Sequence, residues 1–241
     1  MNTNSYLQLG SIEALVVRKP IKNLHLSVLP PAGRVRITAP EYMKDDAIRT
    51  FISTRLTWIK KQQSKFATQE RQTEREYVSG ESHYFFGKRY RLEVIYDDSP
   101  PRVSTKGSRK IILYVRHKST REKREKVMME WYRKELRTVA DRAISKWQKK
   151  TGIQAGSWRI KKMKTRWGTC NQKAGRIWLN LELAKKPIAC IEYVVVHELL
   201  HLIEKRHNER FVNLLTKYLP KWRSQKEELN RFILSHEKWS H

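Results

Sequence analysis

Cysteine is scarce in this sequence, and the few cysteines present exclude several kinds of site. The chain of 241 residues contains two, Cys170 and Cys190. They do not form a C-x-x-C pair, which excludes a zinc knuckle built on cysteine, and two thiols argue against a disulfide framework. We therefore expect the protein to work in a reducing compartment and predict a cytoplasmic location.

Long apolar runs are also lacking. Residues 1–10 are polar and have no apolar signal-peptide core, and no stretch approaches the ~20 apolar residues that a membrane-spanning helix needs. We therefore expect no contact with a membrane. Eight Trp, ten Tyr and a hydrophobic content of 39% predict a folded chain, because disordered chains are poor in such residues.

Acidic residues are few compared with basic ones. Lys and Arg total 51, whereas Asp and Glu total 24, which gives a formal net charge of +27. The basic residues are spread along the chain, which favours a broad positive surface over a detachable basic tail. Such a surface indicates DNA, RNA or a nucleotide as a candidate partner, although net charge carries no sequence specificity.

The first half of the chain shows the alternation that is typical of β-strands. Residues 24–28 and 34–38 alternate apolar and polar side chains around a Pro-Pro-Ala-Gly turn, which predicts a β-hairpin. Residues 12–18 are a further strand candidate, and apolar residues spaced three and four apart over 48–59 predict one helix. A second β section follows, with strand candidates at 84–86, 90–94 and 109–115. We find no internal repeat in the sequence.

The second half is predominantly helical. Ser119 and Glu122 have the spacing of a capping box, and apolar residues follow at helical spacing as far as Gly152, a typical helix end. We further expect strands at 157–163 and 176–183, a helix that starts at Pro187, and helices at about 209–218 and 221–234. The sequence therefore predicts an α+β protein, with a β-rich domain containing one helix over 1–117 and a second domain over 118–241.

The strongest functional signal is the H-E-L-L-H motif at 197–201. His197 and His201 are four residues apart, so on a helix they lie on one face and can bind a single zinc ion. Glu198 can take a proton from the metal-bound water, whose pKa zinc lowers from ~15.7 towards ~7. The mostly apolar residues 191–196 predict a buried helix, in which unpaired polar side chains would be costly. The motif therefore predicts a hydrolase with one Zn²⁺ per chain.

The third zinc ligand has several candidates. His207 follows the motif at the metzincin spacing, but Glu204 replaces the metzincin glycine. For His207 to reach the metal, the chain has to turn after Glu204, and Asn208 is a suitable N-cap for a following helix. Glu204 could instead orient a ligand, and Glu227 or Glu228 could supply a carboxylate. We favour His207 as the third ligand.

With its surroundings, the motif resembles the YgjP-like metallopeptidase family, whose relatives include SprT-like and WLM zinc peptidases. The resemblance rests on V-V-V-H-E-L-L-H at 194–201, H-N-x-x-F at 207–211, R-W-G-T-C at 166–170 (the family has R-W-G-S-C) and R-I-W-L-N at 176–180. It implies a minimal zincin-like catalytic domain formed by a long helix, a small sheet, the motif helix and C-terminal helices. It also implies three metal ligands, His197, His201 and His207, with Glu198 as the general base.

Arg166 and Trp167 have no spacing argument for catalysis. We expect Trp167 to pack beneath the motif helix and Arg166 to pair with a carboxylate. The alternative for Arg166 is contact with a carbonyl or phosphate of the substrate. Both residues are therefore kept as candidates for supporting the site or for binding the substrate.

These observations predict a zinc metallopeptidase that acts on a protein or peptide. Residues 176–183 are a candidate edge strand along which an extended substrate could align. A first alternative is a metal-dependent nucleotide pyrophosphatase, because Arg and Lys side chains favour phosphate oxygens. A second is a nucleic-acid-associated protein whose basic surface positions the metal site, with the 1–117 domain contacting the substrate or the nucleic acid.

Overall fold

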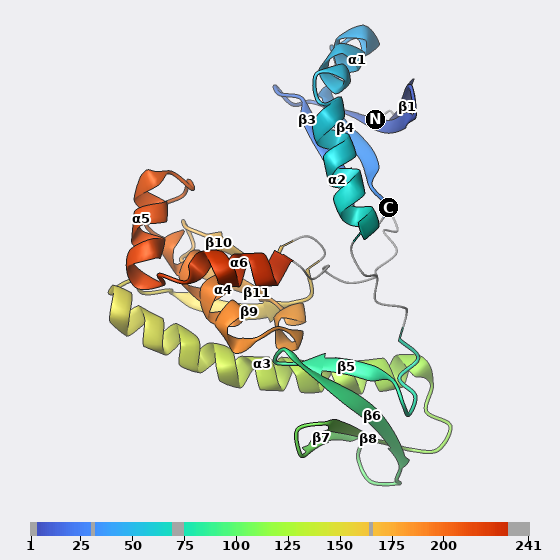
Figure 1. The fold of residues 1–241 in the computed structure, drawn as a ribbon, viewed down its shortest axis with the longest axis vertical. Helices are drawn as coiled ribbons and strands as arrows, with labels where there is room; N and C mark the ends of the chain where they lie inside the picture. The colour runs from blue at the N-terminus through green and yellow to red at the C-terminus, as the bar shows by residue number, and fades with distance from the viewer. Residues whose placement is uncertain (1–3, 30–31, 69–74, 164–165, 231–241) are drawn as a thin grey trace. The chain divides into compact units, whose positions relative to one another are not determined.

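The fold is described from a computed structural model, which covers residues 4–29, 32–68, 75–163 and 166–230. The chain forms two compact units, Met1–Arg71 and Gln72–His241. The covered ranges contain six α-helices and three small mixed sheets, so the predicted α+β class is confirmed (Figure 1). Within those ranges, no helix combines the length and the apolarity that a membrane span requires.

The first unit is a four-stranded sheet followed by two helices. Its strands are β1 (Asn4–Leu9), β2 (Ile12–Lys19), β3 (His25–Leu29) and β4 (Arg34–Pro40). Their order is β1-β2-β4-β3, with β2 and β4 parallel and the outer pairs antiparallel. The predicted hairpin is confirmed as β3 and β4, and the strand candidate at 12–18 as β2, whereas β1 was not predicted.

Two helices, α1 (Asp45–Ser53) and α2 (Leu56–Thr68), replace the single helix expected over 48–59. The break between them lies at Thr54 and Arg55, where the Arg55 amide donates to the carbonyl of Ile52, three residues back, at 2.9 Å, and Thr54 Oγ1 donates to the carbonyl of Phe51 at 2.9 Å. Such bonds offer the backbone an alternative to continuing the helix. The helices and the sheet share ten buried apolar residues, which include Ile37 of β4 and Ile52 of α1. This unit therefore has a core of its own.

The second unit begins with another four-stranded sheet. Its strands are β5 (Ser82–Phe85), β6 (Lys88–Tyr96), β7 (Arg102–Lys106) and β8 (Lys110–Val115). The order β5-β6-β8-β7, with β6 and β8 parallel and the outer pairs antiparallel, repeats the arrangement of the first sheet. The topology thus contains a repeat that we did not find in the sequence.

The expected domain boundary between 117 and 118 falls inside the second unit. Apolar residues of β6 and β8 share one buried cluster with the long helix α3 (Arg121–Thr151), which runs along the second unit (Figure 1). Tyr132 of α3 donates a hydrogen bond to the carbonyl of Tyr84 at 2.9 Å. Gly87, at φ 80°, lies so close to Pro187 that a Cβ would come within 2.7 Å of its ring. The compact units therefore separate at Arg71, because β5–β8 bury their apolar face against α3.

Helix α3 begins and ends close to the predicted residues. Its N-cap is Thr120, one residue after the predicted Ser119, and Thr120 accepts a hydrogen bond from the Lys123 amide. Gly152 ends the helix in the left-handed conformation at φ 75°. This conformation explains why glycine suits the position.

The remaining elements surround the motif helix. They are β9 (Ser157–Lys161), β10 (Gly168–Asn171), β11 (Arg176–Asn180), the 3-10 helix η1 (Leu181–Lys185), α4 (Ile188–Leu200), α5 (Glu209–Tyr218) and α6 (Trp222–Asn230). Helix α5 matches the prediction at both ends, whereas residues 231–234 of the expected last helix lie outside the described residues. The third sheet has the order β10-β11-β9. The expectation that residues 176–183 form an edge strand is therefore wrong: β11 is central, because β10, predicted as a loop, pairs with it.

Candidate metal centre

The motif lies on α4, which is buried on most sides. The helix starts after Pro187 and packs on α3, α5, α6 and the third sheet. Val195, Val196 and Leu199 are fully buried within the main core. The helix that carries the motif is thus buried, as the sequence predicted; Glu198 is buried with it, and His197 and His201 are half-buried.

A turn after α4 brings the third histidine back to the first two. The amide of Glu204 donates to the carbonyl of Leu200 at 2.9 Å, after which the helical pattern stops. Helix α5 then starts at its N-cap Asn208, whose side chain accepts a hydrogen bond from the Phe211 amide at 3.0 Å. The cap immediately follows His207 and therefore fixes the backbone beside that residue.

The three imidazole rings point their Nε2 atoms at one another. The Nε2 of His201 is 3.1 Å from that of His197 and 3.1 Å from that of His207, and the remaining pair is 3.0 Å apart. Atoms at these separations can all lie about 2.0–2.1 Å from one point, the distance at which imidazole binds zinc. The donor set and its geometry therefore fit a zinc ion.

The ring of His201 is held by the chain around it. Its Nδ1 lies 3.0 Å from the main-chain oxygen of Glu204, to which it can donate, and this bond leaves Nε2 as the acceptor. The Glu204 carboxylate faces elsewhere, towards the Arg206 amide at 3.4 Å and Arg210 at 3.9 Å. Glu204 thus contacts a histidine through its backbone and not through its side chain.

The surroundings of His197 and His207 favour the neutral form of their imidazoles. Burial lowers the pKa of His197 to about 3, and the neighbouring His201 and His207 contribute. Burial also lowers the pKa of His207, with a further contribution from His201. Imidazole has to be neutral to bind a metal, so these environments favour a ligand role near neutral pH.

No carboxylate belongs to the cluster in the described part of the chain. The group of His, Cys, Asp and Glu side chains close enough to share an ion consists of the three histidines. The alternative ligands Glu204, Glu227 and Glu228 are not in it, and Glu228 instead contacts the Cys190 sulfur at 3.7 Å. The structure therefore brings together His197, His201 and His207, the combination that we favoured.

Phe211 supports all three imidazole rings from α5. Its ring centroid lies 5.0 Å from that of His197, 4.8 Å from that of His201 and 4.9 Å from that of His207, and the side chain is 1% exposed. Sequence reasoning noted this residue only as part of a family pattern. Its position four residues after His207, in the first turn of a capped helix, is the signal that could have indicated its role.

Glu198 is buried beside the histidines, with 5% of its surface exposed. Burial raises the pKa of its carboxyl to about 8, and the positive charge of Arg166 partly opposes this rise. Gly168 of β10 packs against it so tightly that a Cβ at this position would lie 2.6 Å from Glu198 Oε1. Gly168, which sequence reasoning did not single out, therefore allows β10 to approach the carboxylate.

A cleft of about 780 Å³ gives access to these groups. Its lining consists of Arg166, Gly168, Thr169, Cys170, Asn171, Gln172, Lys173, His197, Glu198, His201, Lys205 and His207. Arg166 is exposed, and in the described structure its guanidinium has no ion-pair partner, so the expected pairing with a carboxylate is not observed. Trp167 is half-buried against the main core, and Lys186 Nζ lies 5.4 Å from its ring.

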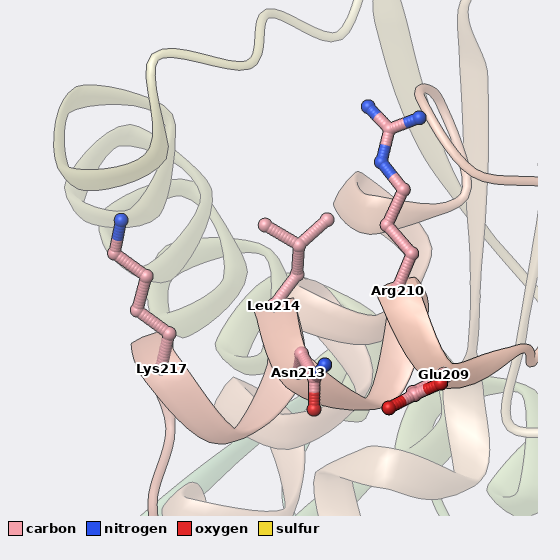
Figure 2. A pocket seen from close by; sticks show the side chains of 5 residues that line it. All are labelled: Glu209, Arg210, Asn213, Leu214 and Lys217. Atoms are coloured by element: carbon pink, nitrogen blue, oxygen red, sulfur yellow. The ribbon is translucent and has the colours of Figure 1, made fainter.

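A second hollow, of about 440 Å³, lies along the outer side of α5 and contains none of the site residues (Figure 2). Its lining side chains are Glu209, Arg210, Asn213, Leu214 and Lys217. Figure 2 shows that these side chains diverge from the helix and do not converge on a common point. We therefore assign this hollow no part in the metal centre.

Residues 22–232 match the family described as YgjP-like, metallopeptidase domain. The chain belongs to the YgjP-like metallopeptidase family. The description of this family supports a metal-dependent peptidase, an activity that implies a protein or peptide substrate.

A solved structure, titled "Crystal structure of the metallopeptidase zymogen of Pyrococcus abyssi abylysin", is similar to this chain at 20% identity and a TM-score of 0.36. The similarity covers 37% of this chain and 90% of that chain. No curated protein matches the sequence.

Proposed function

We propose that this YgjP-like protein is a zinc peptidase in which His197, His201 and His207 hold one zinc ion and Glu198 is the general base. The observation that carries the proposal is the convergence of three Nε2 atoms, 3.0 to 3.1 Å apart, in the same cleft as a buried carboxylate. A bound zinc ion would polarise the scissile carbonyl and lower the pKa of water.

The side chains of the chain itself would move the protons and orient the substrate. Glu198 would accept a proton from the attacking water and later donate it to the leaving amine nitrogen. Its contact with Gly168 restricts the position of the carboxylate. Arg166, exposed at the cleft and close enough to influence Glu198, would bind a carbonyl or carboxylate oxygen of the substrate.

Strand β10 offers an edge to which an extended peptide could bind. In the described sheet β10 pairs with β11 on one side, and no strand pairs with it on the other. All four of its residues line the cleft that contains Glu198. A peptide added to this edge by main-chain hydrogen bonds would pass beside the general base.

A nucleotide pyrophosphatase is the second candidate, and the charge of the cleft favours it. Arg166, Lys173 and Lys205 line the cleft, and Glu198 is the single acidic residue among the lining residues. Basic side chains at such a cleft would bind the oxygens of a phosphoanhydride. The same general base would serve both reactions, so a comparison of substrates has to separate them.

The test is a substrate screen with the zinc-loaded wild type and Glu198→Gln. We expect the wild type to cleave casein and the variant to lose about 10³-fold in rate, because an uncharged amide cannot accept the proton. Zinc content, measured by mass spectrometry, should stay at the wild-type level. Glu204→Gln is the matched control, and it should keep its rate within about threefold because the Glu204 carboxylate faces away from the histidines.

The outcomes separate the two candidates. Release of pyrophosphate and nucleoside monophosphate from nucleoside triphosphates that is lost in Glu198→Gln, without casein cleavage by the wild type, would support the pyrophosphatase instead. Casein cleavage at the wild-type rate in Glu198→Gln would overturn the proposed role of this residue in either reaction.

A further inference from the structure

The chain contains no acidic residue between Asp141 and Glu182. These 40 residues, 142–181, include eleven Lys or Arg residues. A segment of this length would contain about four acidic residues if Asp and Glu were distributed evenly along the chain. The segment forms the end of α3 and all of β9, β10 and β11. Positive charge is therefore concentrated around the third sheet.

The third sheet presents part of this charge on one face. Alternate residues of a strand point to opposite sides. Ile160 of β9 and Leu179 of β11 are paired in register and buried in the main core. The residues directly before and after each of them along its strand therefore lie on the opposite face of the sheet. We call this opposite side the outer face and define it by Arg159, Lys161, Thr169, Asn171, Arg176 and Trp178.

A tryptophan lies at the centre of the outer face, between cations. Trp178 is paired in register with Arg159 on one side and with Thr169 on the other. Lys161 Nζ lies 4.8 Å, and the Cζ of Arg176 5.6 Å, from a ring centroid of its indole. The indole is half-buried, and Arg159 and Lys161 are exposed. An aromatic surface and several cations are thus available together.

The cations of the outer face lack carboxylate partners in the described part of the chain. Arg159, Lys161 and Arg176 form no ion pair there, whereas Lys146 on α3 pairs with Glu192 at 2.7 Å. Because no carboxylate of the face neutralises this positive charge, the charge remains available to attract a polyanion. The charge of the outer face therefore indicates a polyanionic partner.

We propose that the outer face binds single-stranded nucleic acid. The phosphates would contact Arg159, Lys161 and Arg176, and a base would stack on Trp178. An aromatic ring bordered by cations on a sheet surface recognises unpaired bases, because every base has a face that can stack. A duplex keeps its bases stacked inside and could use the cations alone. Thr169 and Asn171 of the outer face also line the cleft, whereas Arg159, Lys161, Arg176 and Trp178 do not, so the residues that carry the inference lie outside the proposed metal site.

Fluorescence anisotropy with labelled oligothymidylate and oligouridylate tests the proposal on the full-length protein. We expect at least one of the two to bind more tightly than a duplex of the same length. Arg159→Gln/Lys161→Gln should weaken binding by about tenfold and reduce the slope of log Kd against log salt by roughly 1.4, for two lost phosphate contacts. Trp178→Ala should weaken binding at least about fivefold, and Trp178→Phe should restore most of it.

The matched control is Lys126→Gln/Lys134→Gln, which removes the same charge from exposed positions on α3. It should change the affinity less than twofold. An equal loss in the control pair, or no effect of Trp178→Ala in a variant with unchanged circular dichroism, would show only general attraction to a polyanion and overturn the proposal. Failure to bind either oligonucleotide, equal binding of the duplex, or a preference for an acidic protein would also overturn it.

Discussion

The two four-stranded sheets have the same strand order and the same strand directions, yet they bury their apolar faces differently. The β1–β4 sheet packs with α1 and α2 in a compact unit that has its own core. The β5–β8 sheet packs on α3 and shares one buried cluster with α4, α5 and α6. Similar topology therefore gives a unit with its own core in one case and part of the unit that contains the three histidines in the other.

The difference between the sheets lies in the helix that follows each of them. Helix α1 has nine residues and α2 thirteen, whereas α3 has thirty-one and carries buried residues from Met128 to Trp147. A helix of this length can cover the sheet with its first half and pack against α4 further along. Helix α3 is thus long enough to contact both the β5–β8 sheet and α4, the helix that carries the motif.

Equivalent core positions in the two fourth strands should show the largest contrast. Ile37 of β4 and Leu113 of β8 are both fully buried. Ile37→Ala and Leu113→Ala should each lower the free energy of unfolding of their own unit by about 2–5 kcal/mol. When casein cleavage is measured at increasing urea concentration, Leu113→Ala should lose activity at a lower concentration than the wild type. Ile37→Ala should lose activity at the same concentration as the wild type. Equal loss of activity in the two variants would show that the units are coupled.

Acid should also affect the two units differently, through His83 of β5. Among the described residues, all buried polar and charged side chains belong to the second unit. His83 is 3% exposed, and its pKa is lowered to about 4, by burial first and then by the charge of Arg75. The neutral ring therefore contributes to the free energy of unfolding. This contribution is fully present above about pH 6.5, the pKa of histidine in the unfolded chain, and is lost as the pH falls towards about 4.

A comparison with His83→Gln isolates this contribution from those of other groups. The excess stability of the wild type over the variant should be larger at about pH 7.5 than at about pH 5, by roughly 2 kcal/mol in urea unfolding of the second unit. The unfolding of the first unit should be the same in both proteins. A difference that does not vary with pH would contradict the neutral buried state of His83.

Helix caps should give the smallest contrast. Asn208 caps α5, whereas α1 begins at Lys44 without a side-chain cap although the backbone there is extended. Asn208→Ala should cost the second unit about 1 kcal/mol, and Lys44→Ser should stabilise the first unit by up to about 1 kcal/mol. Because Asn208 follows His207, its removal should also weaken zinc binding in a competition with a chelating dye. Unchanged zinc affinity would contradict the positioning role of the cap.

Elements marked by local signals could be predicted from the sequence. The spacing of apolar residues and Gly152 indicated α3, and Asn208 indicated the start of α5. Strand β10 was missed because its four residues, G-T-C-N, show no apolar alternation, and it becomes a strand by pairing with β11. The unit boundary was misplaced because the contact of β5–β8 with α3 joins segments that are distant in the chain.

In the candidate site, too, some residues could be predicted from local signals and others could not. His197, Glu198 and His201 follow from helical periodicity, and His207 from the cap beside it. The contact of Gly168 with Glu198 and that of Phe211 with the three imidazoles depend on how β10 and α5 pack on α4. No periodicity within a single element encodes such packing, so these two residues required the structure.

The most direct measurement for the proposed zinc centre is a metal titration of the full-length protein. The protein is first stripped of metal with a chelator, and casein cleavage is then followed as zinc is added. We predict that the rate rises linearly and reaches its maximum at about one zinc ion per chain, because the three histidines form a single site. Full cleavage by the metal-free protein, or stoichiometric zinc binding without any cleavage, would contradict this account.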